Sequence, residues 1–144
     1  WWWEYPGTDS LFVLNGMISV LFELWDYSQF SADPRAASLF DQGYQAVLQK
    51  LPEFDFHGYS RYAAGREMAG RLYHQKHIAQ LQRLNRIKPS PLLQKYARRW
   101  LFHDRLPFPW QLVFNPRPWR VLGFIITWLV IAVLTYLMLV RIKN

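Results

Sequence analysis

The sequence predicts an all-α protein in which a domain of helical hairpins is followed by one transmembrane helix. Apolar residues recur at spacings of three and four along four segments, as they do on the buried face of a helix. Proline-containing breaks separate these segments, and the clearest are Asp33-Pro34, Leu51-Pro52 and Pro89-Ser90-Pro91. Near the end of the chain, Val121–Val140 is a run of twenty residues without a charged side chain. Together these observations define the predicted fold class.

The first two helices are expected to form a hairpin. The first should run from Leu11 to Tyr27, with Thr8, Asp9 and Ser10 as candidate N-cap residues. The second should follow Asp33, a natural N-cap, with Pro34 in its first turn, and should end at Leu51-Pro52. The apolar residues of the first helix share one face, which we expect to be buried: Leu11, Leu14, Ile18, Leu21 and Trp25.

The middle of the chain changes its pattern twice. Phe54–Tyr62 alternates aromatic and polar residues around Gly58, which predicts a short hairpin or a loop. A third helix is expected from about Glu67 or Arg71 to Ile87, and a fourth from Leu92 to about His103. The inward positions expected for the third helix are Leu72, Ile78, Leu81 and Leu84.

The end of the chain predicts a membrane anchor. Residues 106–119 interleave prolines with aromatic residues, which indicates a stiff linker between a domain at 1–105 and a transmembrane helix at 120–141. At a rise of about 1.5 Å per residue, the uncharged run spans a hydrocarbon core of about 30 Å. A buried core helix is the alternative, but such a helix seldom stays uncharged on every face. Basic residues flank both ends, so charge does not set the orientation.

Composition narrows the classes of function. The 144 residues are 51% apolar and 18% aromatic, which excludes a disordered tail and suffices for one domain with a core. The absence of cysteine excludes disulfides, thiolate zinc sites and a cysteine nucleophile. A net charge of +7 suits an anionic partner. Because the chain opens with Trp1 and not Met, we expect it to be the C-terminal part of a longer protein.

Three tyrosines stand at segment boundaries, where a side chain can reach a cleft: Tyr5, Tyr62 and Tyr73. A free tyrosine has a pKa of about 10, so it needs nearby cations to act as a base at neutral pH. Arg66 and the neighbouring arginines could supply that charge, or they could bind a substrate carboxylate. From composition alone, ordinary aromatic packing is the favoured interpretation of each tyrosine.

Two further pairs of residues are candidates for a site. His74 and His77 are neighbours on the surface of the expected third helix. They could begin a metal site, but no third ligand is evident, so hydrogen bonding or substrate orientation is the favoured interpretation. Asn15-Gly16 lies inside the first helix, where glycine costs about 1 kcal/mol relative to alanine. Close approach of another helix or of a ligand would explain that glycine.

Several of these segments carry a family resemblance. Trp3-Glu4-Tyr5-Pro6, Phe12-Val13-Leu14-Asn15-Gly16, Tyr73-His74-x-x-His77-Ile78-x-Gln80-Leu81 and Arg99-Trp100 resemble the C-terminal domain of D-glucuronyl C5-epimerases. Leu51-Pro52-x-Phe54-Asp55 is similar to another segment of that family. The resemblance covers roughly Trp3 to His103. It implies a partial, toroid-like α/α-barrel, preceded in the family by a β-rich part.

The resemblance also implies an activity, the isomerase reaction that converts D-glucuronate to L-iduronate within heparan-type glycosaminoglycans. Tyr5, Tyr62 and Tyr73 match the family's catalytic tyrosines, and the implied substrate-binding residues are Glu4, Asn15, Arg66, His74 and His77. No cofactor and no metal are expected. The family's upstream acidic residue is absent from this chain, the loop between Tyr62 and Tyr73 is shorter than in animal members, and those members are anchored at the other end.

The expected partners are an acidic polysaccharide and a lipid bilayer, not nucleic acid, and a homodimer is left open. The predicted localisation is a single-pass membrane protein with an extracytoplasmic catalytic domain, lumenal or periplasmic. Two alternatives accompany the epimerase. One is a polysaccharide lyase, which begins with the same removal of the C5 proton. The other is a non-catalytic glycan-binding module tethered to the membrane.

Overall fold

The computed structural model describes residues 11–31, 33–107 and 118–143. The chain falls into two compact units, Trp1–Arg105 and Leu106–Asn144. Within the described part of the first unit, helices predominate and are joined by one small two-stranded sheet. The second unit contributes one long helix. The structure is therefore mostly helical, as the sequence predicts.

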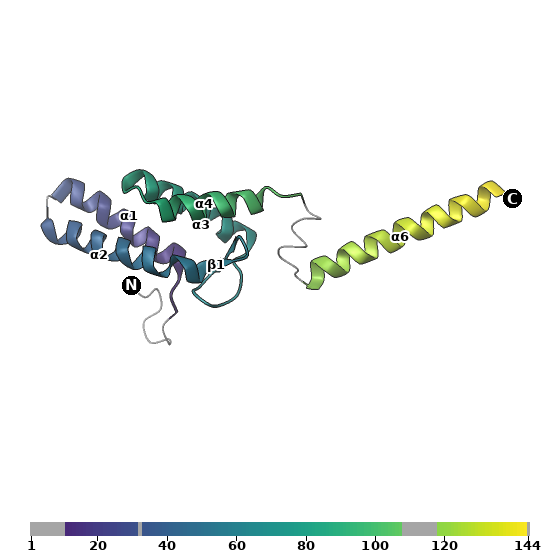
Figure 1. Cartoon of the computed structure of the whole chain (residues 1–144), viewed down its shortest axis with the longest axis horizontal. Coiled ribbons are helices and arrows are strands. Elements are labelled where there is room, and N and C mark those ends of the chain that lie inside the picture. The colour runs from purple at the N-terminus through teal and green to yellow at the C-terminus, as the bar shows by residue number, and fades with distance from the viewer. Residues whose placement is uncertain (1–10, 32, 108–117, 144) are drawn as a thin grey trace. The chain divides into compact units, whose positions relative to one another are not determined.

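The first unit is built from two helical hairpins (Figure 1). Helices α1 (Leu14–Ser31) and α2 (Pro34–Lys50) pack together, and so do α3 (Arg71–Ile87) and α4 (Pro91–Asp104). Contacts between α1 and α3 join the two hairpins around a common core. The core side chains include Leu14, Ile18, Leu21, Phe40, Val47, Leu81, Leu84, Leu93 and Trp100. The described helices form packed pairs and do not close a barrel.

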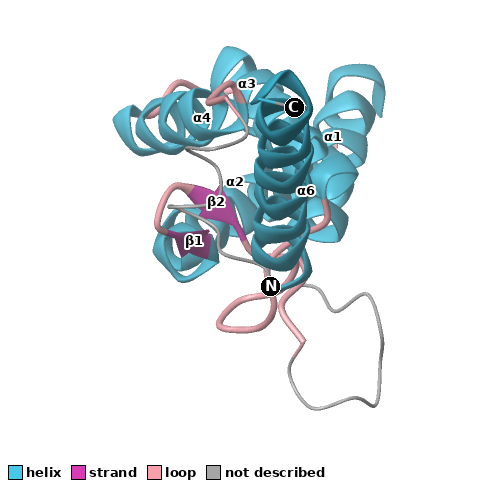
Figure 2. Ribbon diagram, turned by 90° about the vertical axis from the view of Figure 1, so that its right-hand side faces the viewer, coloured by secondary structure: helices cyan, strands magenta, loops and turns pink. Residues whose placement is uncertain are grey.

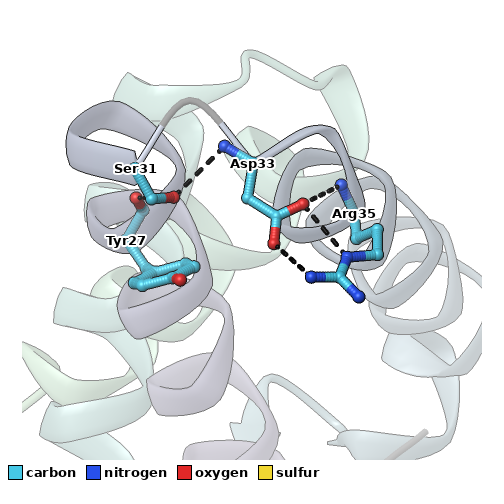
Figure 3. Close-up of polar contacts among 4 residues, drawn as sticks. All are labelled: Tyr27, Ser31, Asp33 and Arg35. Atoms are coloured by element: carbon cyan, nitrogen blue, oxygen red, sulfur yellow. Dashed lines mark hydrogen bonds and ion pairs between the residues drawn. The ribbon is translucent and has the colours of Figure 1, made fainter.

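A polar turn sets the boundary between α1 and α2 (Figure 3). The Ser31 hydroxyl donates to the Tyr27 carbonyl at 2.9 Å and accepts from the Asp33 backbone N–H at 3.2 Å. The Asp33 carboxylate caps α2 by accepting from the Arg35 backbone N–H at 2.9 Å, and it also binds the Arg35 guanidinium. These bonds to Arg35 hold the pKa of Asp33 below its usual value. The cap at Asp33 and the proline at position 34 are confirmed.

A small β-hairpin connects the two pairs of helices (Figure 2). After a short 3-10 helix, η1 (Leu51–Phe54), strand β1 (Asp55–Phe56) pairs antiparallel with β2 (Tyr59–Ser60). The two turn residues have positive φ, 49° at His57 and 92° at Gly58, as mirror-image two-residue turns require. The predicted hairpin in Phe54–Tyr62 is therefore confirmed.

Several local expectations differ from the structure, among them the end of α1, which lies at Ser31 and not at Tyr27. Helix α1 begins at Leu14 and not Leu11, because the backbone at Phe12 and Val13 pairs with the segment Ala63–Ala64. Leu72 was expected to face inward, but it is 82% exposed, because the buried face of α3 is set by other positions. The candidate caps Thr8, Asp9 and Ser10 lie outside the described residues.

The second unit contains α6 (Pro118–Lys143). Its segment Val121–Arg141 is long and apolar enough to cross a membrane, and none of it is buried. Two hydroxyl groups in this segment bond within the helix, Thr127 to the Gly123 carbonyl at 2.9 Å and Thr135 to the Ile131 carbonyl at 2.8 Å. Most of the expected linker, residues 108–117, lies outside the described residues, and the domain boundaries stay a prediction.

Replacing Gly58 by alanine should lower the free energy of unfolding by about 3 kcal/mol. The left-handed backbone at this position disfavours any Cβ, and an added Cβ would also collide with the His103 ring. Urea denaturation in mild detergent, followed by tryptophan fluorescence, measures the change. Gly65→Ala is the matched control, since Gly65 has φ of 67° but open space around it. The Gly65→Ala variant should lower the free energy of unfolding by only about 1 kcal/mol. Equal losses in the two variants would contradict the predicted collision with the His103 ring.

Candidate functional site

Two of the predicted catalytic tyrosines meet in the folded unit. The rings of Tyr62 and Tyr73 lie edge to face, with their centroids 4.9 Å apart. Tyr73 stands in the first turn of α3 and is 42% exposed, whereas Tyr62 is half-buried in the loop after β2. The structure thus brings together two phenols that are eleven residues apart in the sequence, with one of them open to a ligand.

The backbone around Tyr62 is held on both sides. Its N–H donates to the Glu67 carbonyl at 3.1 Å, and the preceding Arg61 pairs with Met68 as an isolated antiparallel bridge. The following residue, Ala63, pairs with Val13 just before α1. The loop that carries Tyr62 is therefore fastened to the start of α1 as well as to its own return segment.

Three arginines belong to the segments that carry these tyrosines. Arg66 and Arg71 are exposed, Arg66 in the Tyr62 loop and Arg71 as the first residue of α3. Arg61 is half-buried, where its guanidinium lies over the Phe56 ring at 4.7 Å and donates to the Arg66 carbonyl. Arg66 and Arg71 are thus exposed cations in the segments that carry Tyr62 and Tyr73.

The two predicted histidines lie beneath this surface. Both His74 and His77 are 0% exposed. The Nδ1 atom of His74 lies 3.0 Å from the Ser60 backbone nitrogen and 2.8 Å from the Ser60 hydroxyl, which lies 2.9 Å from the Nδ1 atom of His77. The Tyr59 ring stacks on His74 at 3.7 Å. In this structure the histidines therefore join α3 to the β-hairpin and present no surface to solvent.

Trp100 completes the buried cluster from α4. Its carbonyl lies 3.3 Å from His74 Nε2, and its indole N–H donates to the Asp55 carboxylate at 2.7 Å. The same carboxylate forms an ion pair with Arg99 at 3.3 Å. A closed set of polar contacts thus links both strands of the hairpin to α3 and α4 around a fully buried indole.

Burial keeps both histidines neutral. It lowers the pKa of His74 to about 4 and that of His77 to about 3. The positive forms of His74 and Lys76 reinforce the effect on the pKa of His77, whereas Asp104 opposes the effect on the pKa of His74. At pH 7 the rings can therefore donate and accept hydrogen bonds but carry no charge.

Asn15 lies at the interface of α1 and α3. Its backbone carbonyl accepts from the Gln80 side-chain N–H at 3.0 Å, and the same amide group donates to the Ser19 hydroxyl at 3.1 Å. The side chain of Asn15 is buried, and its Oδ1 has no hydrogen-bond partner among the described residues. Close contact between α1 and α3 thus agrees with the helix-crossing interpretation of Asn15-Gly16.

The remaining predicted residues and the cavities lie elsewhere. Glu4 and Tyr5 fall outside the described residues. A cavity of about 310 Å³ lies where α1 ends and α2 begins, lined by residues that include Trp25, Asp33 and Phe40. None of its lining residues is a predicted site residue, so the tyrosine pair stays the better candidate on chemistry. In the described part of the chain, no three His, Asp or Glu side chains gather as a metal would require.

Sequence reasoning missed the residues that support the site. Ser60 was included in the predicted hairpin but was not singled out, although it holds both histidines. Asp55 and Trp100 appeared only as parts of the family resemblance, without a role. No local signal identifies these residues, because the side-chain hydrogen bonds that give them their roles join segments at least fourteen residues apart.

Comparison with known proteins identifies the family of this chain. The family model for the D-glucuronyl C5-epimerase C-terminus matches residues 1–101 of this helical chain. The chain belongs to that family.

Two relatives show how low the sequence identity is. The D-glucuronyl C5-epimerase of Caenorhabditis elegans is 28% identical over 120 residues, which cover 70% of this chain and 20% of that protein. An uncharacterized protein of Methanocaldococcus jannaschii is 25% identical over 100 residues, which cover 69% of this chain and 32% of that protein. The chain thus spans between a fifth and a third of the length of these curated relatives.

The buried histidines should make the fold acid-sensitive. Their folded-state pKa values lie below the ordinary 6.5, so the unfolded chain binds more protons as the pH falls through 6.5. The free energy of unfolding is retained above that pH and should fall by about 2 kcal/mol per histidine between pH 7 and pH 5. Urea denaturation at the two pH values measures the difference.

His77→Asn should remove about half of this difference, because asparagine can still donate to Ser60 but does not titrate. His57→Asn is the control, since His57 is exposed in the β-turn and is not buried on folding. If His77→Asn left the pH dependence of the free energy of unfolding unchanged, the assignment of this acid sensitivity to His77 would be wrong.

Proposed function

We propose that this chain is part of a membrane-anchored epimerase that inverts C5 of D-glucuronate to L-iduronate in an acidic polysaccharide. The observation that carries the proposal is the contact between Tyr62 and Tyr73 at 4.9 Å, in segments that also carry the exposed Arg66 and Arg71. Membership in the D-glucuronyl C5-epimerase C-terminal family supplies the reaction class. The two helical hairpins are, on this proposal, a segment of an α/α-barrel.

The proposed reaction is proton exchange at the carbon next to the uronate carboxylate. One group removes the C5 proton, and another returns a proton to the opposite face. We assign these acid and base roles to Tyr73 and Tyr5, with Tyr62 assisting. The carbon keeps its oxidation state, so no redox cofactor takes part.

Cations would stabilise the negative charge that develops as the C5 proton leaves. Arg66 is our candidate for binding the uronate carboxylate, because its side chain is exposed in the loop that carries Tyr62. A tyrosine hydroxyl with an ordinary pKa near 10 also becomes a better base beside cations, which favour the phenolate. Charge placed where the transition state needs it is a large source of catalysis.

The other predicted binding residues take different places in the proposal. Glu4 and Asn15 remain proposed contacts of the substrate. His74 and His77 are fully buried, and their contacts run to Ser60 and Trp100. We therefore propose that these histidines serve the substrate by holding the segments that carry Tyr62 and Tyr73.

Helix α6 is the proposed single-pass anchor. Support comes from the length and hydropathy of Val121–Arg141 and from the absence of buried residues in it. The proposal places the catalytic domain on the extracytoplasmic side, where the acidic polysaccharide would be modified.

Replacing Tyr73 by phenylalanine should lower turnover by at least about 100-fold, because the proton-transferring hydroxyl is lost while the ring remains. The full-length protein, with any residues that precede Trp1 in its gene, is incubated with an unsulfated glucuronate polymer in deuterated water. NMR then follows deuterium and iduronate signals at C5. Tyr27→Phe is the control, since Tyr27 is an exposed tyrosine on α1.

The outcomes separate the alternatives. Deuterium at C5 with iduronate signals and intact chains supports the epimerase, whereas unsaturated uronate ends would identify a lyase. No exchange by a folded protein would favour a glycan-binding module. Full activity in Tyr73→Phe would show that the assignment of Tyr73 is wrong.

Charges in the middle of α6 should abolish membrane anchoring. Lysine at a helix centre disfavours insertion by about 3 kcal/mol, so Leu129→Lys combined with Leu134→Lys should release the protein. Alkaline carbonate extraction of the membrane fraction measures the release. The matched control places lysines at the exposed Leu39 and Leu72 of the first unit. Retention of the α6 variant in the membrane would count against α6 as the anchor.

A further inference from the structure

The Ser60 hydroxyl occupies a buried position between two imidazole rings. Ser60 is 0% exposed, and its Oγ lies 2.8 Å from His74 Nδ1 and 2.9 Å from His77 Nδ1. A hydroxyl has one proton, so it can donate to only one of the two nitrogens. The other nitrogen must then be the donor, because two acceptors at this distance would repel each other.

The backbone decides which nitrogen accepts. The Ser60 backbone N–H donates to His74 Nδ1 at 3.0 Å, so that nitrogen carries no proton. The neutral ring of His74 therefore carries its proton on Nε2, which donates to the Trp100 carbonyl at 3.3 Å. Both nitrogens of His74 are thereby occupied.

The remaining protons follow from this assignment. His74 Nδ1 carries no proton and already accepts from the Ser60 backbone N–H. The Ser60 hydroxyl, 2.8 Å away, therefore shares the same lone pair as the second donor of a three-centre bond, because the reverse orientation would place two lone pairs against each other. The hydroxyl can then only accept from His77, so His77 carries its proton on Nδ1. The Nε2 atom of His77 is left as an unprotonated, buried acceptor with no hydrogen-bond partner among the described residues.

We propose that Ser60 is a positioning residue that fixes opposite tautomers in His74 and His77 and so joins β2, which leads into the Tyr62 loop, to the helix that carries Tyr73. Hydrogen bonds run in one direction, from His77 through Ser60 and His74 to the Trp100 carbonyl. Ser60 precedes Tyr62 by two residues, and His74 directly follows Tyr73. The relative placement of the two phenols therefore depends on this hydroxyl.

The tautomers can be read directly from the chain in detergent micelles. Long-range proton–nitrogen correlation NMR at neutral pH distinguishes a protonated ring nitrogen from an unprotonated one. We expect His74 to be protonated on Nε2 and His77 on Nδ1. The finding that His77 carries its proton on Nε2 in the unaltered chain would overturn the proposal without any variant.

The Ser60→Ala variant should affect the two histidine rings differently. His74 keeps its backbone donor at residue 60 and should stay in its tautomer, so it serves as an internal control. His77 loses its acceptor, and its proton should move from Nδ1 to Nε2. Ser60→Thr keeps a hydroxyl and should keep the Nδ1–H form. No change of His77 in Ser60→Ala, or a change of both rings, would contradict the proposed chain.

The effect on catalysis rests on the proposed epimerase function and is measured separately. In the full-length protein, Ser60→Ala should lower kcat by about 10- to 100-fold with little change in KM, because the reacting groups shift while the binding surface remains. Ser60→Thr should recover most of the rate. If the predicted tautomers are found but the full-length protein has no epimerase activity, only the proposed function is wrong. If Ser60→Ala changes the tautomer of His77 but leaves full activity, Ser60 is not important for catalysis.

Discussion

The buried contact between one serine hydroxyl and two imidazoles is the constraint on which the candidate site depends. Ser60, His74 and His77 have no exposed surface, so none of these groups can replace a lost protein hydrogen bond with bulk water. A buried polar group left without a partner costs about 1–3 kcal/mol. The folded unit therefore tolerates little change in the distance between the β-hairpin and α3, and that distance places Tyr62 near Tyr73.

A network of this kind explains how so short a sheet can be ordered. Strands of two residues contribute few ladder bonds, and a lone hairpin is marginally stable in water. Here each strand also binds the helices, β1 through the Asp55 carboxylate on the Trp100 indole and β2 through Ser60 on the histidines. Apolar packing alone would permit several registers, whereas these directional bonds are satisfied in one.

The sequence predicted well the structural features that depend on residues close together in the chain. The start of α2 follows from Asp33 and Pro34. Helix α4 begins at Pro91, one residue before the predicted Leu92, and Ser90 caps it by accepting from the Leu92 N–H. The mirror-image turn follows from Gly58. Each of these features is set within a few residues, so the local pattern contains the cause.

Contacts between distant segments account for what the sequence did not predict. The late start of α1 depends on Ala63, fifty residues after Val13. The inward face of α3 contains His74 and His77, which do not count as apolar in a periodicity argument, and this shifted the expected face toward Leu72. Likewise, the tyrosine pair could be suspected from the resemblance, but the role of Ser60 appears only when strand and helix are placed together.

The hydroxyls of α6 limit how this helix can associate with others. Thr127 and Thr135 direct their protons to carbonyls of the preceding turn. In hydrocarbon, a hydroxyl satisfied in this way needs no outside partner. It follows that the threonines give little reason for the helix to self-associate, because interhelical bonding through their protons would first have to break these internal bonds. Lateral contacts would have to come from the shape of the helix surface instead.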